Sequence, residues 1–175
     1  MIVFTVFLFL LYTWFLASGY HIADIGNLLR ETNKGTKNFT LLDSGYDATL
    51  EKEGKGVKVT MNSHADNGWI VLFYNDGYSK DVLKSPQGDK YVLSFNIKSN
   101  IEHTHIRVSH KEKNAKNNQI DFGDAYIENS NKWVHITLEG TLTGEDITAQ
   151  GLYIDLRGNP AGTTISIRDL RLVHR

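Results

Sequence analysis

The chain has 175 residues, 41% of them hydrophobic and 22% charged, which is enough for one globular domain with a core of its own. Its formal net charge of −1 provides no field that would gather nucleic acid. The absence of cysteine excludes disulfides, thiolate metal sites and a cysteine nucleophile.

The N-terminal residues 1–17 are almost wholly apolar, and no charged side chain occurs before Asp24. A membrane-spanning helix needs about 20 apolar residues, with a range of about 17–25, so this segment sits at the short end of that range. The small residues Ala17, Ser18 and Gly19 suit a cleavage site after an export signal. Three interpretations stay open for residues 1–19: a helical membrane anchor, a cleaved signal peptide, or an artefact of the start site or a buried segment.

The rest of the chain carries strand patterns separated by turns. Residues 57–61 alternate between apolar and polar side chains, and residues 69–74 form a continuous apolar run suited to a strand covered on both faces. Residues 91–98 and 105–109 alternate in the same way. Further strand patterns follow at residues 133–142, 152–157 and 164–173.

Alternation assigns one face of each strand to the core. We expect the inward face to carry Leu93, Phe95, Ile97, Ile106, Val108, Leu152, Ile154 and Leu156. No stretch after Gly35 shows the sustained 3.6-residue apolar stripe of a helix. The sequence therefore predicts an all-β fold, an antiparallel β-sandwich (jelly roll, galactose-binding-like) over residues 27–175, with the apolar N-terminal helical segment outside it.

Four stretches of this domain carry a resemblance to a known family. They are Asn-Leu-Leu at 27–29, Lys-Tyr-Val-Leu-Ser-Phe-Asn-Ile-Lys-Ser at 90–99, Asn-Lys-Trp-Val-His-Ile-Thr-Leu at 131–138, and Gly-Thr-Thr-Ile-Ser-Ile-Arg-Asp-Leu-Arg-Leu at 162–172. In this order they resemble the carbohydrate-binding-module-like jelly rolls found beside glycoside hydrolases and in phage tail and baseplate minor structural proteins. The resemblance implies a β-sandwich that binds a glycan or polysaccharide.

The same resemblance implies a structural calcium. Asp169 occupies the position of the acid in the family's closing strand, and a calcium there would need further oxygen ligands from the N-terminal part of the domain. Members of the family often follow the opening leucines with a Phe-Glu pair, whereas residues 30–33 of this chain read Arg-Glu-Thr-Asn. The expected calcium site therefore lacks one of its usual markers.

Other candidate chemistry is sparse. His103, His105 and His110 would form a metal site only on a shared strand face, and polar residues on a solvated face are the commoner explanation. A glycosidase would need two carboxylates about 5–9.5 Å apart, a separation that the sequence does not give. The candidates for such a pair are Asp121, Asp124, Asp146 and Asp155. Because no phosphate-binding loop or nucleophile elbow occurs either, we expect no enzymatic activity.

A sugar site needs an aromatic ring for the C–H face of the sugar and planar hydrogen-bonding groups for its hydroxyls. The outward positions of three strands supply both kinds of group, provided that residues 91–98, 105–109 and 152–157 adjoin in one sheet. We expect the ligand-binding residues to be Tyr153, Asn96, Arg107, Asp155, Arg157 and His105. An aromatic rim near the turns, formed by Trp69, Tyr74 and Tyr78, is the alternative.

Two functions stay open. One is a non-catalytic glycan-binding module that mediates adhesion to cell-surface saccharide from a phage virion or a bacterial surface, assembled with other virion proteins. The other is a structural or interaction β-sandwich that binds no sugar. Both predict a virion, extracellular or cell-surface location, with membrane attachment if residues 1–17 are retained. Nucleic acid is not an expected partner.

Overall fold

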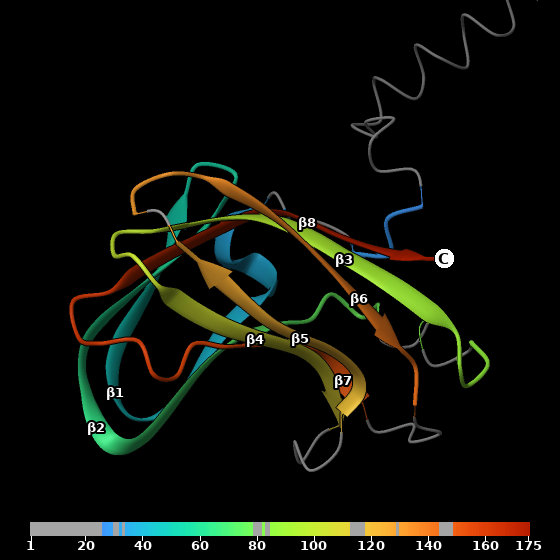
Figure 1. Cartoon of the computed structure of the whole chain (residues 1–175), viewed down its shortest axis with the longest axis horizontal. Coiled ribbons are helices and arrows are strands. Elements are labelled where there is room, and N and C mark those ends of the chain that lie inside the picture. Colours follow the sequence, from blue (N-terminus) through green and yellow to red (C-terminus); the bar gives the residue numbers. More distant parts are fainter. Residues whose placement is uncertain are drawn as a thin grey trace, which may run out of the picture.

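In the computed structural model the chain folds into antiparallel strands (Figure 1). The structure describes residues 26–29, 32, 34–78, 82, 85–112, 118–128, 130–143 and 149–175. A short 3-10 helix, Gly35–Asn38, comes first. The strands are β1 (Phe39–Glu53), β2 (Gly56–Tyr74), β3 (Lys90–Ser99), β4 (Thr104–Glu112), β5 (Asn118–Ile127), β6 (Val134–Thr141), β7 (Ala149–Asp155) and β8 (Thr164–His174). The all-β prediction is confirmed.

The long strand β2 connects two layers. Its residues 71–74 pair with β7, its residues 57–60 pair with β8, and β1 runs beside it as a hairpin partner. The complete strand order is β5-β4-β7-β2-β8-β3-β6. We call β5, β4, β7 and the end of β2 the β4 sheet, and the start of β2 with β8, β3 and β6 the β3 sheet. Figure 1 shows β3, β6 and β8 above β4, β5 and β7, with the β1–β2 hairpin bent round one side.

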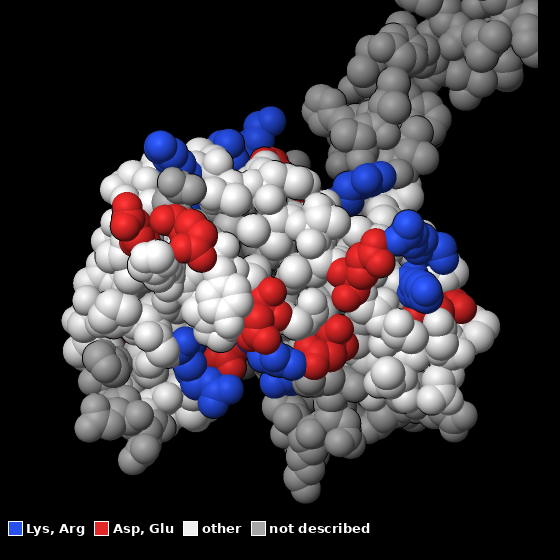
Figure 2. All heavy atoms as spheres, in the orientation of Figure 1, with Lys and Arg blue, Asp and Glu red and all other residues white. Residues whose placement is uncertain are grey.

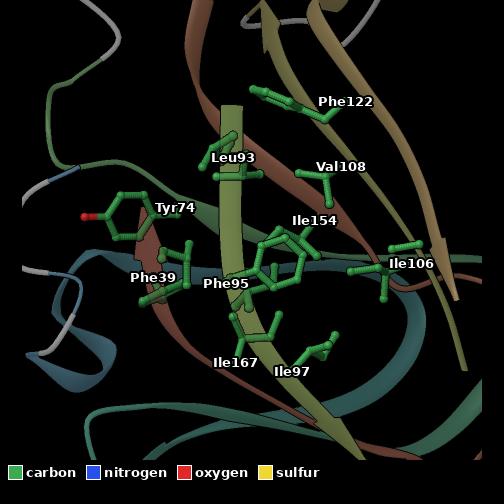
Figure 3. Packing of buried hydrophobic residues seen from close by; sticks show 14 of the residues in the cluster. Phe39, Tyr74, Leu93, Phe95, Ile97, Ile106, Val108, Phe122, Ile154 and Ile167 are labelled. Atoms are coloured by element: carbon green, nitrogen blue, oxygen red, sulfur yellow. The ribbon is translucent and has the colours of Figure 1, made fainter. Parts of the chain in front are cut away.

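The core lies between these two sheets, as Figure 3 shows. Phe95 and Ile97 of β3 point toward Ile106 of β4 and Ile154 of β7, and all four side chains are fully buried. Removing such a side chain from water stabilises the fold by about 1.5–3 kcal/mol. The remaining residues that alternation assigns to the core, Leu93, Val108, Leu152 and Leu156, are also fully buried, so the predicted inward faces are correct.

The opening residues of the domain are bound to its closing strand. Asn27 accepts hydrogen bonds at Oδ1 from the backbone N–H groups of Leu29 (3.1 Å) and Leu172 (2.9 Å), and its Nδ2 donates to the carbonyl of Leu170 (3.3 Å). The Leu28 N–H donates to the carbonyl of Leu172 at 2.8 Å. One amide side chain and one backbone bond thus join the two ends of residues 27–175.

The interpretation of residues 69–74 as a strand covered on both faces is wrong. Ile70, Leu72 and Tyr74 are fully buried, whereas Trp69 is exposed and Phe73 is half-buried. The run belongs to the end of β2, which has one face in the core and one toward solvent. Apolar residues on a solvated face are therefore what makes the run continuous.

The predicted segment 1–19 lies outside the described residues. Within the part of the chain that the structure describes, no helix is long and apolar enough to cross a bilayer.

Candidate functional site

The outer face of the β4 sheet gathers side chains from four strands. In β4 and β7, Arg107 lies opposite Asp155, and Ser109 lies opposite Tyr153. The same rows continue into β2, because Val71 pairs with Asp155 and Phe73 pairs with Tyr153. Since their strand neighbours are the buried core residues, period-two geometry directs all of these side chains to one outer face. We call it the β4-sheet face.

Arg107 is the centre of an ionic network on this face. Its two terminal nitrogens donate to Asp124 Oδ2 at 2.7 Å and to Asp121 Oδ2 at 2.5 Å. The other oxygen of Asp124 lies 2.7 Å from His105 Nε2. The arginine and both aspartates are partly exposed, with 34–43% of each side chain accessible to solvent. The network therefore holds its charged groups in fixed positions at a surface that a ligand can reach.

A β-bulge in β5 places both aspartates beside Arg107. Asp121 and Asp124 are three residues apart, so in a regular strand their side chains would point to opposite faces. The register between β4 and β5 shifts after Val108, which pairs with Gly123, while Ser109 pairs with Asp121. Gly123 has a φ of 86° and donates its N–H to Asp121 Oδ1 at 3.0 Å. A glycine adopts this left-handed conformation without strain. The extra residue in the bulge turns one carboxylate to the same face as the other.

A second ion pair lies at the end of β7. Arg157 donates through Nε and a terminal nitrogen to Asp155, with the closest contact at 2.6 Å. The hydrogen bonds and the negative charge of Asp155 raise the pKa of Arg157 above its ordinary value. The network of Arg107 and this pair lie in neighbouring strands, because Arg107 and Asp155 face each other across the ladder.

The aromatic residues of this face differ in exposure. Tyr153 has only 8% of its surface exposed. Its ring packs on Phe73, with centroids 4.9 Å apart, and the Lys111 ammonium lies 5.9 Å from its centroid. The burial raises the pKa of the Tyr153 hydroxyl. By contrast, Tyr126 is 61% exposed and Trp69 is 40% exposed.

Tyr126 and Trp69 lie at the two ends of a row of side chains that crosses the strands of the β4-sheet face. Tyr126 pairs with His105 across β5 and β4, and their rings are 4.9 Å apart. On the other side, the Leu156 N–H donates to the carbonyl of Ile70, the neighbour of Trp69, at 3.0 Å. Arg157 follows Leu156 and lies between these two sides. The row therefore reads Tyr126, His105, Arg157, Trp69, with an exposed ring at each end.

Asn96 does not belong to this group, so the assumption that three strands adjoin is wrong for β3. In the strand order, β2 and β8 lie between β7 and β3. Asn96 lies in the β3 sheet, where its Nδ2 donates to Asp169 at 2.8 Å and its Oδ1 lies 3.1 Å from His135 Nδ1. Alternation indicates which way a side chain points, but the neighbouring strand depends on long-range pairing.

Of the three rings in the aromatic-rim alternative, only Trp69 is exposed. Tyr74 and Tyr78 are at most 1% exposed and belong to the core cluster. Sequence reasoning also missed Tyr126 and Phe73 as members of the β4-sheet face. The bulge hides the alternation of β5, and Phe73 looked like one more core residue of a continuous apolar run.

Asp169 and the histidines show no shared metal geometry. Asp169 Oδ2 accepts from Asn96 and lies 3.4 Å from Arg168 Nε, so cationic and N–H donors occupy its surroundings. His103 pairs with Glu128 at 2.7 Å, and His110 is buried on the inner face of β4. Among the residues described, no group of three His, Cys, Asp or Glu side chains is placed to hold a metal ion. The calcium at Asp169 stays a prediction.

Comparison with known proteins gives likeness of structure only. No protein-family model matches the chain, and no curated protein matches its sequence. The family 11 carbohydrate-binding module of the cellulosomal cellulase Lic26A-Cel5E of Clostridium thermocellum is similar, with a TM-score of 0.55, 15% identity, and coverage of 86% of this chain and 95% of that one. A CBM4 structure has a TM-score of 0.58 at 13% identity, covering 85% of this chain and 94% of that one.

Tailspike protein 4 of bacteriophage CBA120, as its enzymatically active domain, is also similar, with a TM-score of 0.56 and 13% identity. The match covers 86% of this chain but 22% of the tailspike chain. The sequence resemblance stated above is confirmed at the level of fold: this chain is a β-sandwich with the fold of carbohydrate-binding modules.

Proposed function

We propose that this protein is a non-catalytic glycan-binding module and that the saccharide lies on the β4-sheet face. The observation that carries the proposal is the row of side chains with an exposed aromatic ring at each end, Tyr126 and Trp69, and hydrogen-bonding groups between them. The fold shared with carbohydrate-binding modules supports the same function.

The dimensions of the row suit a chain of several sugar units. Tyr126 and Trp69 are three strands apart, which at a strand spacing of about 4.8 Å is roughly 14 Å. Each ring offers an apolar surface for the C–H face of a sugar. Between them, His105, Arg157 and the neighbouring Arg107 offer donors to hydroxyl groups, and Asp155 offers acceptors. Tyr153 lies on the same face, two residues along β7 from Asp155, packed on Phe73 and beneath the Lys111 ammonium.

The charges of the face favour a neutral saccharide. Arg107 and Arg157 each bind aspartate oxygens at 2.5–3.0 Å, so neither guanidinium is an uncompensated positive charge. Asp121, Asp124 and Asp155 balance Arg107, Arg157 and Lys111, so this face carries no excess positive charge for an acidic sugar. The surface drawn in Figure 2 likewise has basic and acidic side chains intermixed. A neutral sugar gains hydrogen bonds to ionised groups without a charge mismatch.

In a biological setting, we propose adhesion to cell-surface saccharide from a phage virion or a bacterial surface. The likeness to a bacteriophage tailspike domain supports this setting. A single open face should bind in the micromolar to millimolar range, about 4–8 kcal/mol, so stable adhesion needs several copies acting together. Assembly with other virion proteins would supply those copies, and residues 1–17 would add a membrane anchor where they are retained.

A glycan array probed with the full chain, followed by calorimetric titration of the strongest neutral oligosaccharide, tests the proposal. We expect Trp69→Ala and Tyr126→Ala each to weaken binding about tenfold, because each removes one stacking ring. Thr137→Ala is the matched control, because Thr137 is exposed on the β3 sheet. Equal affinities in all three variants would move the site elsewhere. An array without any saccharide signal would overturn the proposal and favour a structural or interaction domain.

A further inference from the structure

A buried amide, Asn159, connects the strands that carry the candidate site. It lies in the loop between β7 and β8 and has 3% of its surface exposed. Its Oδ1 accepts from the backbone N–H of His105 at 3.1 Å, and its Nδ2 donates to the carbonyl of the same residue at 2.8 Å. The Nδ2 also donates to the carbonyl of Leu156 at 2.8 Å. All three contacts are to backbone atoms.

The position of these bonds continues the β-ladder beyond the end of β7. The β4–β7 pairing ends where Arg107 faces Asp155, and the next outward position along β4 is His105. There the amide of Asn159 supplies the donor and acceptor that a backbone peptide group would supply. On the opposite side, the Leu156 N–H is bound to the carbonyl of Ile70 at 3.0 Å. The loop is therefore fixed between β4 and β2.

This arrangement fixes the position of Arg157. It lies between Leu156 and Asn159 in the chain, and both of these neighbours are bound to flanking strands. Its guanidinium is bound to Asp155, so the loop and this ion pair together hold Arg157 on the β4-sheet face. Only an amide has both the N–H donors and the oxygen acceptor that these bonds need: aspartate lacks the donors, and leucine lacks both.

We propose that Asn159 is a positioning residue of the saccharide site, acting through His105 and Arg157 without touching the ligand. This rests on the proposed function of the β4-sheet face. Replacing the donor by a second oxygen turns two bonds to carbonyl groups into repulsions. The loop then leaves β4, and Arg157 and His105 no longer keep their places in the row.

The chain contains a control in Asn100, an amide at an exposed position. Its Nδ2 donates to the carbonyl of Gly162 at 2.9 Å, and its Oδ1 accepts from the Thr164 N–H at 2.7 Å. This is the same kind of amide bridge to the other end of the β7–β8 connection, but it starts beyond β3 and is away from the β4-sheet face. Asn159→Asp and Asn100→Asp therefore make the same chemical change at two places.

The experiment measures the affinity of both variants for cellohexaose and mannohexaose, at a temperature where unfolding curves show each to be folded. Amide hydrogen exchange of residues 105 and 157 is measured without sugar. We expect Asn159→Asp to lose about tenfold in affinity and the local protection of these amides, whereas Asn100→Asp keeps its affinity within about twofold. Asn159→Ser, which retains one donor and adds no charge, replaces the aspartate variant if that one does not fold.

The outcomes separate the two proposals. If the wild-type chain binds the sugars and Asn159→Asp binds equally well, the positioning role is overturned and the binding function stands. Equal losses in the Asn159 and Asn100 variants would make Asn159 merely structural and also overturn the role. If the wild-type chain binds neither sugar, hydrogen exchange decides: protection at residues 105 and 157 that falls no more than elsewhere overturns the role.

Discussion

Tyr153 points to the face that the alternation of its strand predicts, yet its ring is covered by neighbours. It packs on Phe73 and beneath Lys111, so it gives little free surface for stacking. The exposed rings come instead from Trp69 and Tyr126 at the two ends of the row. Alternation decides the direction in which a side chain points, whereas its exposure depends on the size of the neighbouring side chains.

His110 should make the stability of the protein depend on pH. It is 1% exposed on the inner face of β4, with its ring 5.6 Å from that of Tyr78, and burial lowers its pKa from 6.5 to about 4. Between pH 6.5 and pH 4 the unfolded chain therefore binds a proton that the folded chain does not. The free energy of unfolding falls as the pH falls through this window, by roughly 3 kcal/mol in all.

Urea unfolding at several pH values measures this effect. His110→Leu, which removes the ionisable group, should flatten the dependence between pH 6.5 and pH 4. His103→Gln, which replaces an exposed histidine outside the core, is the control. A slope in His110→Leu equal to that of the wild-type chain would contradict the assignment.

At the scale of the element, the bulge in β5 brings the carboxylates of Asp121 and Asp124 to the same face, where both bind Arg107. Gly123 has the positive φ that the bulge requires, and an added Cβ there would meet no atom within 4 Å. The penalty for any other residue is thus conformational and not steric. Phe122, the extra residue, turns inward and is buried.

We expect Gly123→Ala to cost about 1–2 kcal/mol of stability and to release Asp121 from Arg107. Gly54→Ala is the matched control: Gly54 has a φ of 58° in the β1–β2 turn and equally open space, but it is remote from Arg107. Both variants should lose similar stability in chemical denaturation, while only Gly123→Ala weakens saccharide binding. Equal saccharide binding by the two variants would show that the contact between Asp121 and Arg107 is not needed for binding.

The sequence predicts the strands that alternate regularly between apolar and polar residues, but it does not predict the irregular ones. The patterns at residues 91–98, 105–109 and 152–157 correspond to β3, β4 and β7, although β7 ends at Asp155, and their core residues are buried as predicted. The interruption at Gly123 breaks the alternation of β5, so Asp121 and Asp124 look like scattered acids. Local pattern points Asn96 and Arg107 outward, but it carries no information about which strands become neighbours, so it does not separate the two residues.

At the scale of the whole molecule, residues 27–175 form two sheets with their ends joined through Asn27. A chain that begins at Asp24 keeps this asparagine and its bonds to Leu170 and Leu172. We expect it to be soluble, with a β-dominated circular dichroism spectrum. A chain that begins at Thr32 lacks those bonds and should melt at a lower temperature. A helix-rich spectrum, or no soluble product from the Asp24 chain, would contradict the predicted domain.

The predicted calcium can be tested on the same domain. A cation bound only to the folded state raises stability by about 2.7 kcal/mol when it is at 100 times its Kd. The melting temperature should therefore be higher in calcium than in excess chelator, and Asp169→Asn should remove the difference. Asparagine tolerates the φ of 57° at this position, so the variant changes the ligand and spares the backbone. Identical melting curves in calcium and chelator would eliminate the site.

The way β2 serves both sheets also decides when the protein can finish folding. β1 and β2 can pair early as a hairpin, but the remaining partners of β2 are β7 and β8, which begin at residues 149 and 164. Pairings between such distant segments make folding slow, on the scale of about milliseconds to seconds for β-sandwiches. During synthesis, the second edge of β2 stays without its partners until β7 and β8 have left the ribosome, so neither sheet can be completed before the residues of β8, Thr164–His174, have emerged.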